Sequence, residues 1–546
     1  MHKLLRLTFF AAILLVVGCG TPDPSLQLPS SVIWVAPQDN PNESTVFATI
    51  NAAVQAANGR LIKVRAGTYK ESVNVPASAT IRLEGESDGL VILIPPDEKP
   101  AWSLGEKSDV QVSNLQIEAG LRGFVVAAGS SLSLKNIKIN NVVGQAVFSQ
   151  QATISLLNVS IKNVKRPSEA QFDKIGQGQA VRVEGGKLVV DGCTFEKTAN
   201  RGVNVLKQGI ATISDSTFVG EKTQSVAAIA FQESQGTVTR VTLKQWKEGI
   251  FLLKGSIMME DSTIEDSAGN GLLISDSSWY RLQNNTIKNS AKSGLSSSNS
   301  SGHLLNNTID GSQEYGIFLF QKVAVPQVLV ENNTVTNSKA AGIQVFNTNA
   351  TIVGNKVSGT KLGASQDDGH GIAALDTDNV QILNNETKDN VGAGIFMLRS
   401  WGRVSENKVE NNKETGIFIS EAPTGKSSNL VLNQIVKNRI AGVFVLKSVV
   451  FMLENRVAET VFSKEEQSGS GVVIFGGSEA TIGKDNYEKN EQDGLLIASN
   501  SKANVTSTTF AGNKRWGIFL DCSSSTLKAE QNTFSGNGQG EKNTCR

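Results

Sequence analysis

Apolar and polar residues alternate along this chain in short runs, and polar turns separate the runs. The run from Gly316 to Phe320 alternates in this way, and the segments from Ala211 to Phe218 and from Val328 to Val335 combine such a run with a turn. No stretch of helical period lies between the runs. Because alternation with a period of two is typical of half-buried strands, each recurring unit is predicted to form two or three short strands.

The units recur every 22 to 23 residues, and insertions lengthen some of them. Each unit begins at a small residue, which we call its anchor. Gly271, Gly371 and Gly471 lie 100 residues apart, which indicates that a block of four units was duplicated. The anchors are Gly123, Ala146, Ala180, Gly202, Ala228, Gly249, Gly271, Gly294, Gly316, Gly342, Gly371, Gly394, Gly416, Gly442, Gly471, Gly494 and Gly517.

A chain that turns once per unit stacks each strand on the equivalent strand of the next unit. Such stacking gives parallel sheets with about 4.8 Å between successive turns, or rungs, around one continuous apolar core. Seventeen anchors then imply a rod of roughly 80 Å. A leucine-rich-repeat horseshoe has a similar period, but its Leu-x-x-Leu-x-Leu framework is missing here. The fold class predicted is therefore all-β, a single-stranded parallel β-helix (a solenoid) of about 17–18 rungs.

The turns carry paired asparagines, such as Asn306-Asn307 and Asn332-Asn333. Their predicted role is structural, because asparagine tolerates the left-handed backbone conformation and its amide can bond to the same amide one rung away. Together with the β-branched alternation, they resemble the pectin-lyase-like superfamily, especially its Gly-Ile-x-Leu/Asn-Asn-x-Ile repeat group. The resemblance covers roughly residues 32 to 540 and implies a right-handed parallel β-helix.

The N-terminal part resembles the same superfamily. Phe47 to Val54 is predicted to be an amphipathic helix, with Phe47, Ile50 and Val54 on one face, and it precedes the strand-like segment from Leu61 to Val75. In that superfamily such a helix caps the open end of the coil. A cap is expected on physical grounds, because an uncapped first rung would expose both the core and unpaired backbone to water.

The first residues have the features of an export signal. Lys3 and Arg6 form a basic region, residues 7–17 an apolar region, and residues 16–19 a cleavage site that ends in Cys19. This pattern resembles a bacterial lipoprotein signal, which implies cleavage before Cys19, acylation of its thiol and attachment to a lipid bilayer. An ordinary signal peptide with a chance cysteine is the alternative.

These observations divide the chain into a lipoprotein signal peptide (residues 1–18), a lipid-anchored tether (19–31), an N-terminal cap with the first rungs (32–120), and the β-helix repeats with a C-terminal cap (121–546). The predicted location is the cell envelope. Gly20 stands where many lipoproteins retained at the inner membrane have Asp, so the outer membrane is favoured.

Composition argues against nucleic acid as a partner. The chain has 52 basic and 51 acidic residues, and phosphate binding needs a basic excess. Of three histidines, His2 leaves with the signal, so only His303 and His370 remain for metal or acid–base chemistry. No metal motif is present. Pectate lyases of the superfamily bind calcium through clustered aspartates, and no acidic cluster recurs on neighbouring rungs here, so no cofactor is predicted. Calcium is the alternative, if the insertions assemble a site for it.

One insertion, from Lys361 to His370, concentrates chemically useful side chains. Asp367, Asp368 and His370 could perform acid–base chemistry on a uronate, and they are the candidate catalytic residues. The segment resembles parts of the polygalacturonase and alginate epimerase motifs, but Gly369 stands where the epimerases have Pro and Gly371 where they have an acid. A solvated polar loop is the alternative interpretation.

Alternation predicts which residues of the anchor strand point outward. Positions one and three past each anchor should point into the core, and positions two and four outward. The outward positions are largely apolar, and a stripe of this kind needs either a covering insertion or a partner. The predicted binding surface is centred on Phe318, Phe396, Phe418 and Phe444.

Residues just beyond the anchor strands supply further candidates. Trp279, Tyr280 and Trp401 are aromatics at a turn that could stack on sugar rings, with packing at the turn as the alternative. Arg399 is a candidate binding residue and also belongs to a predicted charge ladder, five residues past successive anchors. The ladder consists of Asp376, Arg399, Glu421 and Lys447.

Near the C-terminus, Cys522 and Cys545 are predicted to form a disulfide that holds a polar tail over the last rung.

Two functions are therefore considered. The first is an envelope lipoprotein that presents a rigid surface to a polysaccharide or an envelope protein. The second is a polysaccharide-active enzyme, a lyase, uronate epimerase or hydrolase, that uses the loop before Gly371. A fold does not decide between them.

Overall fold

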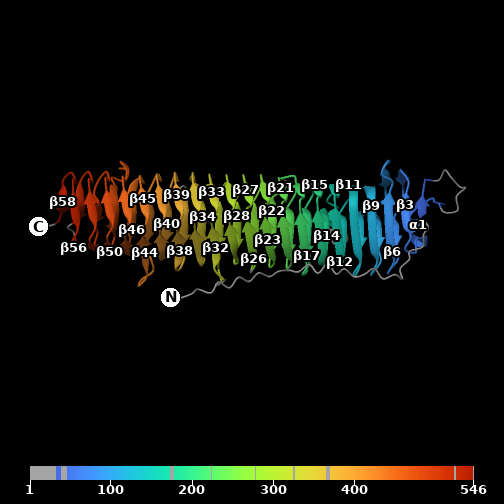
Figure 1. Cartoon of the computed structure of the whole chain (residues 1–546), viewed down its shortest axis with the longest axis horizontal. Helices are drawn as coiled ribbons and strands as arrows, with labels where there is room; N and C mark the ends of the chain where they lie inside the picture. The colour runs from blue at the N-terminus through green and yellow to red at the C-terminus, as the bar shows by residue number, and fades with distance from the viewer. Residues whose placement is uncertain are drawn as a thin grey trace, which may run out of the picture.

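The computed structural model describes residues 32–37, 46–171, 177–222, 224–276, 278–323, 326–364, 369–521 and 524–544. These residues form one straight rod of parallel strands, with the N-terminal rungs at one end and the C-terminal rungs at the other (Figure 1). The predicted all-β, right-handed parallel β-helix is confirmed. It has about 20 turns rather than the expected 17–18, because the first turns have no anchor glycine and escaped the repeat count.

Each turn contributes strands to three sheets, and each strand pairs with its equivalent in the next turn. Three successive strands, β31 (Ile317–Phe320), β32 (Val328–Glu331) and β33 (Thr334–Thr336), show the rule. They pair in parallel with β34 (Ala341–Phe346), β35 (Ala350–Val353) and β36 (Lys356–Ser358), respectively. The register aligns equivalent residues, such as Ile317 with Ile343. The apolar positions therefore stack into one core along the rod.

The strands that carry the anchors make up the first sheet, which we call the anchor sheet. Its members after the first turns are β10 (Arg122–Val126), β12 (Gln145–Leu157), β14 (Gln179–Asp191), β16 (Arg201–Leu206), β19 (Ala227–Gln232), β22 (Glu248–Leu253), β25 (Leu272–Ser275), β28 (Leu295–Ser298), β31, β34, β37 (His370–Leu375), β40 (Ile395–Leu398), β43 (Ile417–Ser420), β46 (Ile440–Leu446), β49 (Gly469–Phe475), β52 (Leu495–Ile497), β55 (Trp516–Leu520) and β58 (Gly540–Asn543).

Anchor glycines are required because neighbouring rungs approach closely at this point. A Cβ at Gly316 would lie 2.3 Å from Cγ1 of Val335 and 2.5 Å from the carbonyl oxygen of Gly342, the next anchor. A Cβ at Gly249 would lie 2.6 Å from the carbonyl oxygen of Gly271. Such distances are far shorter than van der Waals contact. The repeat therefore keeps a residue without a side chain at most anchors.

Asparagines hold the corner between the second and third sheets, as predicted. The first residue of each pair has a left-handed backbone, with φ of 55° at Asn284 and 54° at Asn306. The second residue is buried, and its amide bonds to the next asparagine along the rod, as from Asn307 Nδ2 to Asn333 Oδ1 at 2.9 Å. This ladder, which we call the asparagine ladder, runs through Asn285, Asn307, Asn333, Asn355, Asn385, Asn407, Asn433 and Asn455 to Asp485.

A helix caps the N-terminal end, but it begins later than predicted. It is α1 (Ile50–Ala56), and the Oγ1 of Thr49 accepts a hydrogen bond from the Ala52 N–H at 3.2 Å. Phe47, expected on the helix, instead lies in β2 (Val46–Phe47) and pairs with β1 (Ile33–Val35). The physical reason is that an extended capping residue ends the strand and starts the helix at one point.

The helix packs its buried face on the first rungs. Ile50, Ala53 and Val54 are buried, so the predicted apolar face is correct apart from Phe47. The carboxylate of Glu71 accepts hydrogen bonds from the N–H groups of Ile50 and Asn51 at 2.7 and 2.8 Å. This carboxylate satisfies helix N–H groups that have no partner within the helix.

Several predicted residues lie outside the described part of the chain. They are Cys19, Asp367, Asp368, Cys522 and Cys545. Within the described ranges, no helix is both long and apolar enough to cross a membrane.

Candidate functional site

The alternation predicted for the anchor sheet is confirmed. Ile317 and Leu319, one and three past their anchor, are buried, whereas Phe318 and Phe320 point outward and are half-buried. The same holds in β40, where Ile395 is buried and Phe396 points outward. We call this outward surface the outer face of the anchor sheet. It runs along the length of the rod, so equivalent side chains lie one above another.

Aromatic side chains follow one another along the C-terminal half of this outer face. Adjacent ring centroids are 5.4 Å apart between Phe396 and Phe418, 5.3 Å between Phe418 and Phe444, and 6.3 Å between Phe444 and Phe475. Distances of this size put neighbouring rings in mutual contact. We call the set the aromatic row. It consists of Tyr315, Phe318, Phe320, Phe346, Phe396, Phe418, Phe444 and Phe475.

The rings of the aromatic row stay partly exposed beside the described parts of the insertions, although Ala373 and Val473, which are two past their anchors on the same face, are buried. Phe318, Phe396, Phe418 and Phe444 are half-buried, and Phe475 is 38% exposed. The alternative of a second internal layer, formed by insertions folded over this face, would require these rings to be buried. The apolar stripe is thus a surface of the molecule. Stripes of this kind mark sites of interaction.

His370, a candidate catalytic residue, lies at one edge of this surface. It is the first residue of β37, is 7% exposed, and stacks on Phe396 with ring centroids 4.2 Å apart. Its Nδ1 accepts a hydrogen bond from the Ala393 N–H at 3.0 Å, which fixes the orientation of the ring. Asp367 and Asp368 are outside the described residues, so of the three candidates only His370 is placed.

Trp401 and Arg399 lie at the other edge, in the turn between β40 and β41 (Gly402–Ser405). The Trp401 Nε1–H donates to Asp378 at 3.0 Å, and the Lys426 ammonium lies 4.8 Å from its ring centroid. Since His370 begins an anchor strand and Trp401 follows the end of another, the width of the sheet separates them. His370 and Trp401 therefore border the anchor sheet from opposite edges.

The charge ladder forms in the predicted order. Arg399 donates to both carboxylate oxygens of Asp376, at 2.6 and 2.9 Å. Lys447 lies 3.7 Å from the carboxylate of Glu421. The hydrogen bonds with Asp376 raise the pKa of Arg399. Exposed ion pairs of this kind contribute little stability. The guanidinium of Arg399 is bound to Asp376 at the turn and does not reach into the aromatic row as a partner of its rings.

The two aromatics expected together at an earlier turn have different positions. Trp279 begins β26 (Trp279–Gln283) and is 42% exposed, whereas Tyr280 is completely buried. Tyr280 therefore cannot stack on a sugar, and the prediction that it could is wrong. The reason is again alternation, because successive residues of a strand point to opposite faces.

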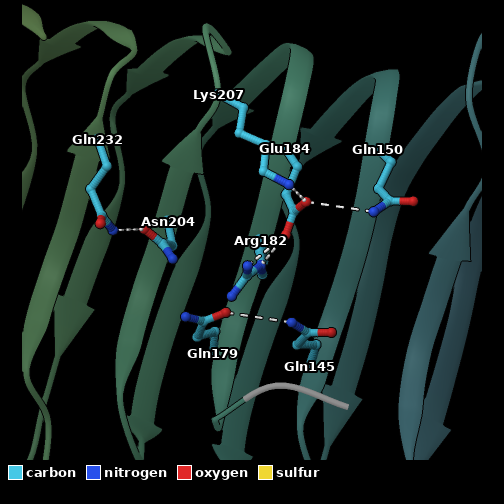
Figure 2. A network of polar contacts seen from close by, with 8 residues as sticks. All are labelled: Gln145, Gln150, Gln179, Arg182, Glu184, Asn204, Lys207 and Gln232. Carbon is cyan, nitrogen blue, oxygen red and sulfur yellow. Dashed lines mark hydrogen bonds and ion pairs between the residues drawn. The ribbon is translucent and has the colours of Figure 1, made fainter. Parts of the chain in front are cut away.

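Sequence reasoning missed a polar network at the N-terminal end of the same outer face. Figure 2 shows it along β12, β14, β16 and β19. At its centre, Glu184 is bound by Arg182 at 2.5 Å and by Lys207 at 2.6 Å. The amide of Gln145 donates to Gln179 at 3.4 Å. The counting rule that found the phenylalanines could have found this network, because Arg182 is two past the anchor Ala180.

Two further arginines join this network by their positions on β10 and β16. The guanidinium of Arg122 lies 4.8 Å from the ring centroid of Phe148, and that of Arg201 lies 5.8 Å from the ring centroid of Phe251. Burial, and then the positive charge of Arg182, lower the pKa of both Arg122 and Arg201. The guanidinium of Arg182 is thus near enough to repel those of Arg122 and Arg201.

Two acidic side chains of this region, Glu184 and Glu248, have opposite pKa shifts. Burial acts to raise the pKa of Glu184, but the hydrogen bonds from Lys207 and Arg182 outweigh it and lower the pKa. Glu248 accepts a hydrogen bond from the Asn270 N–H at 2.9 Å, and burial raises its pKa. Across the described ranges, no group of three or more His, Cys, Asp or Glu side chains is placed to hold a metal ion.

Comparison with known families agrees with this architecture. The chain matches the family described as the right handed beta helix region over residues 158–325, 293–462 and 454–544, and it belongs to that family. No curated protein matches the chain.

Similar solved structures include the periplasmic alginate epimerase AlgG, with a TM-score of 0.32 and 12% identity over 72% of this chain and 78% of that one. An alginate lyase from Paenibacillus sp. str. FPU-7 has a TM-score of 0.32 and 11% identity over 50% and 94%. A GH87 α-1,3-glucanase from Streptomyces thermodiastaticus strain HF3-3 has a TM-score of 0.23 and 11% identity over 90% and 66%. Values this low assign no activity to the chain.

Proposed function

We propose that this protein is a cell-envelope lipoprotein whose rod binds an extended polysaccharide along the outer face of the anchor sheet. The observation that carries the proposal is the aromatic row, in which half-exposed rings contact one another on successive rungs. A strand face that meets only water would instead carry polar side chains.

The row suits a sugar polymer for geometric reasons. Its rings recur with the rung spacing of about 4.8 Å, which is close to the length of one sugar unit. Aromatic rings offer a flat apolar surface at low cost in conformational entropy, and sugar rings present apolar C–H faces that can lie on it. A rigid rod also keeps the rings aligned before the ligand arrives, which limits the entropy lost on binding.

Retention of soluble polysaccharides in native gels tests this proposal. The double variant F396S/F418S removes two neighbouring rings, and F451S is its control, because Phe451 is 46% exposed but belongs to β47 (Val449–Leu453) of the second sheet. Binding should weaken at least tenfold in the double variant and remain unchanged in F451S. Equal retention of all three proteins, with unfolding midpoints alike, would show that this face binds no glycan.

The envelope location rests on the export signal and on acylation of Cys19. Labelled palmitate should enter the wild-type protein expressed in bacteria and should not enter C19A. Incorporation of label into C19A would contradict attachment at this residue. The aromatic row could instead bind an envelope protein. Loss of a co-purifying protein from F396S/F418S, but not from F451S, would favour this interpretation.

A second function, a polysaccharide lyase, epimerase or hydrolase, is favoured by one observation. His370 stacks on Phe396 and therefore borders the aromatic row, where a bound sugar would lie. Uronic-acid polymers incubated with the protein should then yield new reducing or unsaturated ends, or epimerised units. H370A should abolish that turnover, whereas H303A should not, because His303 is exposed on β29 (Ser301–Leu305) of the second sheet.

A further inference from the structure

The three arginines of the polar network occupy one end of the outer face that carries the aromatic row. Arg182 lies on β14, directly beside Asn204 of β16 in the parallel register. Arg201 begins the same strand as Asn204. These residues are on the same sheet as Phe318, five anchors further along, so the network and the row are roughly 24 Å apart along the rod.

Positive charge is in excess here. Both oxygens of Glu184 are already engaged, Oε1 by Arg182 at 2.5 Å and Oε2 by Lys207 at 2.6 Å. Arg201 forms no ion pair with any residue that the structure describes. Its Nε is buried and has no hydrogen-bond partner in the described ranges. A half-buried cation therefore lacks a counter-charge.

Asn204 supplies a second unused donor on the same strand. Its side chain is completely buried, and its Oδ1 accepts a hydrogen bond from Gln232 at 3.1 Å. Its Nδ2 is left with no partner among the described residues. An unpartnered buried donor is costly, and a native protein keeps one where a ligand, a water molecule or an ion satisfies it. Arg201 Nε and Asn204 Nδ2 are both donors, so what each lacks is an acceptor; the buried Oε1 of Gln145, on β12 of the same network, is an acceptor without a donor among the described residues.

We propose that Arg182, Arg201 and Asn204 form a binding site for an oxyanion, the carboxylate or sulfate group of an acidic polysaccharide. The inference deepens the proposed function and rests on it, because the polymer that bears the anion would continue along the aromatic row. Guanidinium groups suit this role, since their planar N–H donors match the two oxygens of a carboxylate or sulfate. The anion supplies both the missing charge and the missing acceptor.

Three polymers with one backbone separate charge from stacking. Hydroxyethyl cellulose is neutral, carboxymethyl cellulose carries carboxylates, and cellulose sulfate carries sulfates. The full-length protein in mild detergent should bind one of the two acidic polymers at least tenfold more tightly than the neutral one. The polymer preferred identifies the anion as carboxylate or sulfate.

R201Q should remove that preference and leave the affinity for hydroxyethyl cellulose unchanged. N204L, which removes the amide but keeps the volume, should reduce the preference as well. The matched control is R240Q, because Arg240 is an exposed arginine that pairs with Asp215 at a turn away from the anchor sheet. Loss of the preference in R201Q but not in R240Q supports the site. Equal effects of R201Q and R240Q would mean that the preference for acidic polymers depends only on the overall charge of the protein, and the proposed site would be overturned.

A small-anion titration keeps this inference distinguishable from the proposed function. Sodium sulfate and sodium acetate, titrated at constant ionic strength against chloride, should give a heat of binding with wild type that is absent with R201Q. If no polymer is retained but this heat is found, the glycan proposal fails and the anion site stands. If F396S/F418S weakens retention while wild type shows neither the heat nor a preference for acidic polymers, the anion site is overturned and the glycan surface stands.

Discussion

Asp485 occupies the last position of the asparagine ladder, and its Oδ1 accepts hydrogen bonds from both the main-chain N–H and the side-chain amide of Asn455, at 2.8 and 3.2 Å. Its Oδ2 accepts from the hydroxyl of the buried Tyr487 at 2.7 Å. Burial raises the pKa of Asp485 to about 7, although these three hydrogen bonds act to lower it. A carboxyl group thus stands where the ladder otherwise uses a neutral amide.

This substitution in the ladder predicts pH-dependent stability. The folded-state pKa is raised above the ordinary 3.8, so the unfolded chain ionises first as the pH rises. The free energy of unfolding should fall by about 1.4 kcal/mol per pH unit between pH ~4 and pH ~7, and then level off. D485N should lose this dependence and be more stable than wild type at pH 8, by up to about 4 kcal/mol.

Urea unfolding from pH 4.5 to pH 8 checks the prediction, with the transition midpoint of each protein as the readout. D191N is a suitable control, because Asp191 is a half-exposed residue of β14. A wild-type midpoint that does not fall across this range would mean that Asp485 is ionised in the folded protein well below pH 7.

The anchors predict a second stability effect. In G316A the new Cβ would lie 2.3 Å from Val335 Cγ1, so neighbouring rungs must move apart, and a loss of about 1–3 kcal/mol is expected. G483A is the matched control, because its Cβ would meet only Leu453 Cδ1, at 3.7 Å, and should cause no loss. Thermal unfolding of both variants decides. Equal unfolding midpoints for G316A and G483A would show that neighbouring rungs can move apart at an anchor without loss of stability.

The rod and its register could be predicted because the repeat imposes one local pattern many times. Each unit repeats the same alternation of apolar and polar residues. Once Ile317 is assigned to the core, the equivalent residues Ile343 and Ile395 are assigned to it as well. The start of α1 was harder to place, because helical spacing alone put Phe47 on the helix face. In the structure Thr49 is the N-cap, so the helix starts at Ile50. The preference of threonine for an N-cap is a weak signal in the sequence, and the apolar spacing of Phe47, Ile50 and Val54 pointed to an earlier start.

The site was predictable only in part, for a related reason. The phenylalanines follow the repeat, whereas Arg182, Arg201 and Asn204 each occur once, and their meeting depends on how long side chains extend across neighbouring rungs. Sequence periodicity places Arg182 and Asn204, each two past its anchor, on the outer face, but it does not say which side chains meet there. His370 was predicted as a candidate catalytic residue from the sequence. Its stacking on Phe396 and the hydrogen bond that it accepts from the Ala393 N–H could not be predicted, because both depend on the fold.

A disulfide between Cys522 and Cys545 stays a prediction, because both residues lie outside the described ranges. A loop of about 22 residues closed in this way should contribute roughly 3 kcal/mol on the chain-entropy model. Alkylation of the denatured, unreduced protein, followed by mass spectrometry, should label Cys193, which is a free and buried thiol, and neither of the other two. Labelling of Cys522 and Cys545 in the mature protein would end the proposal.

The interior of the asparagine ladder gives the last prediction. Asn407 Nδ2 donates to the carbonyl of Ile382 at 2.9 Å and to Asn433 Oδ1 at 3.0 Å, while its own Oδ1 accepts from the side-chain amide of Asn385 at 3.0 Å. N407L fills the same volume but removes the acceptor of the Asn385 main-chain N–H and the side-chain donor to the Ile382 carbonyl, whereas the Asn385 side-chain amide keeps the carbonyls of Ile352 and Leu383. Each unpartnered group costs about 1–3 kcal/mol, so a loss of ~3 kcal/mol or more is expected.

N407D separates the hydrogen bonds of Asn407 from its charge. The carboxylate can still accept from Asn385, so this variant should resemble wild type at pH 4 and become less stable as the pH rises, as Asp485 does in its own rung. N429L is the control, because Asn429 is an exposed residue of β44 (Ser427–Val431) and should change the midpoint little. If N407L unfolds at the same urea concentration as N429L, the ladder sets the shape of the turns without stabilising the rod.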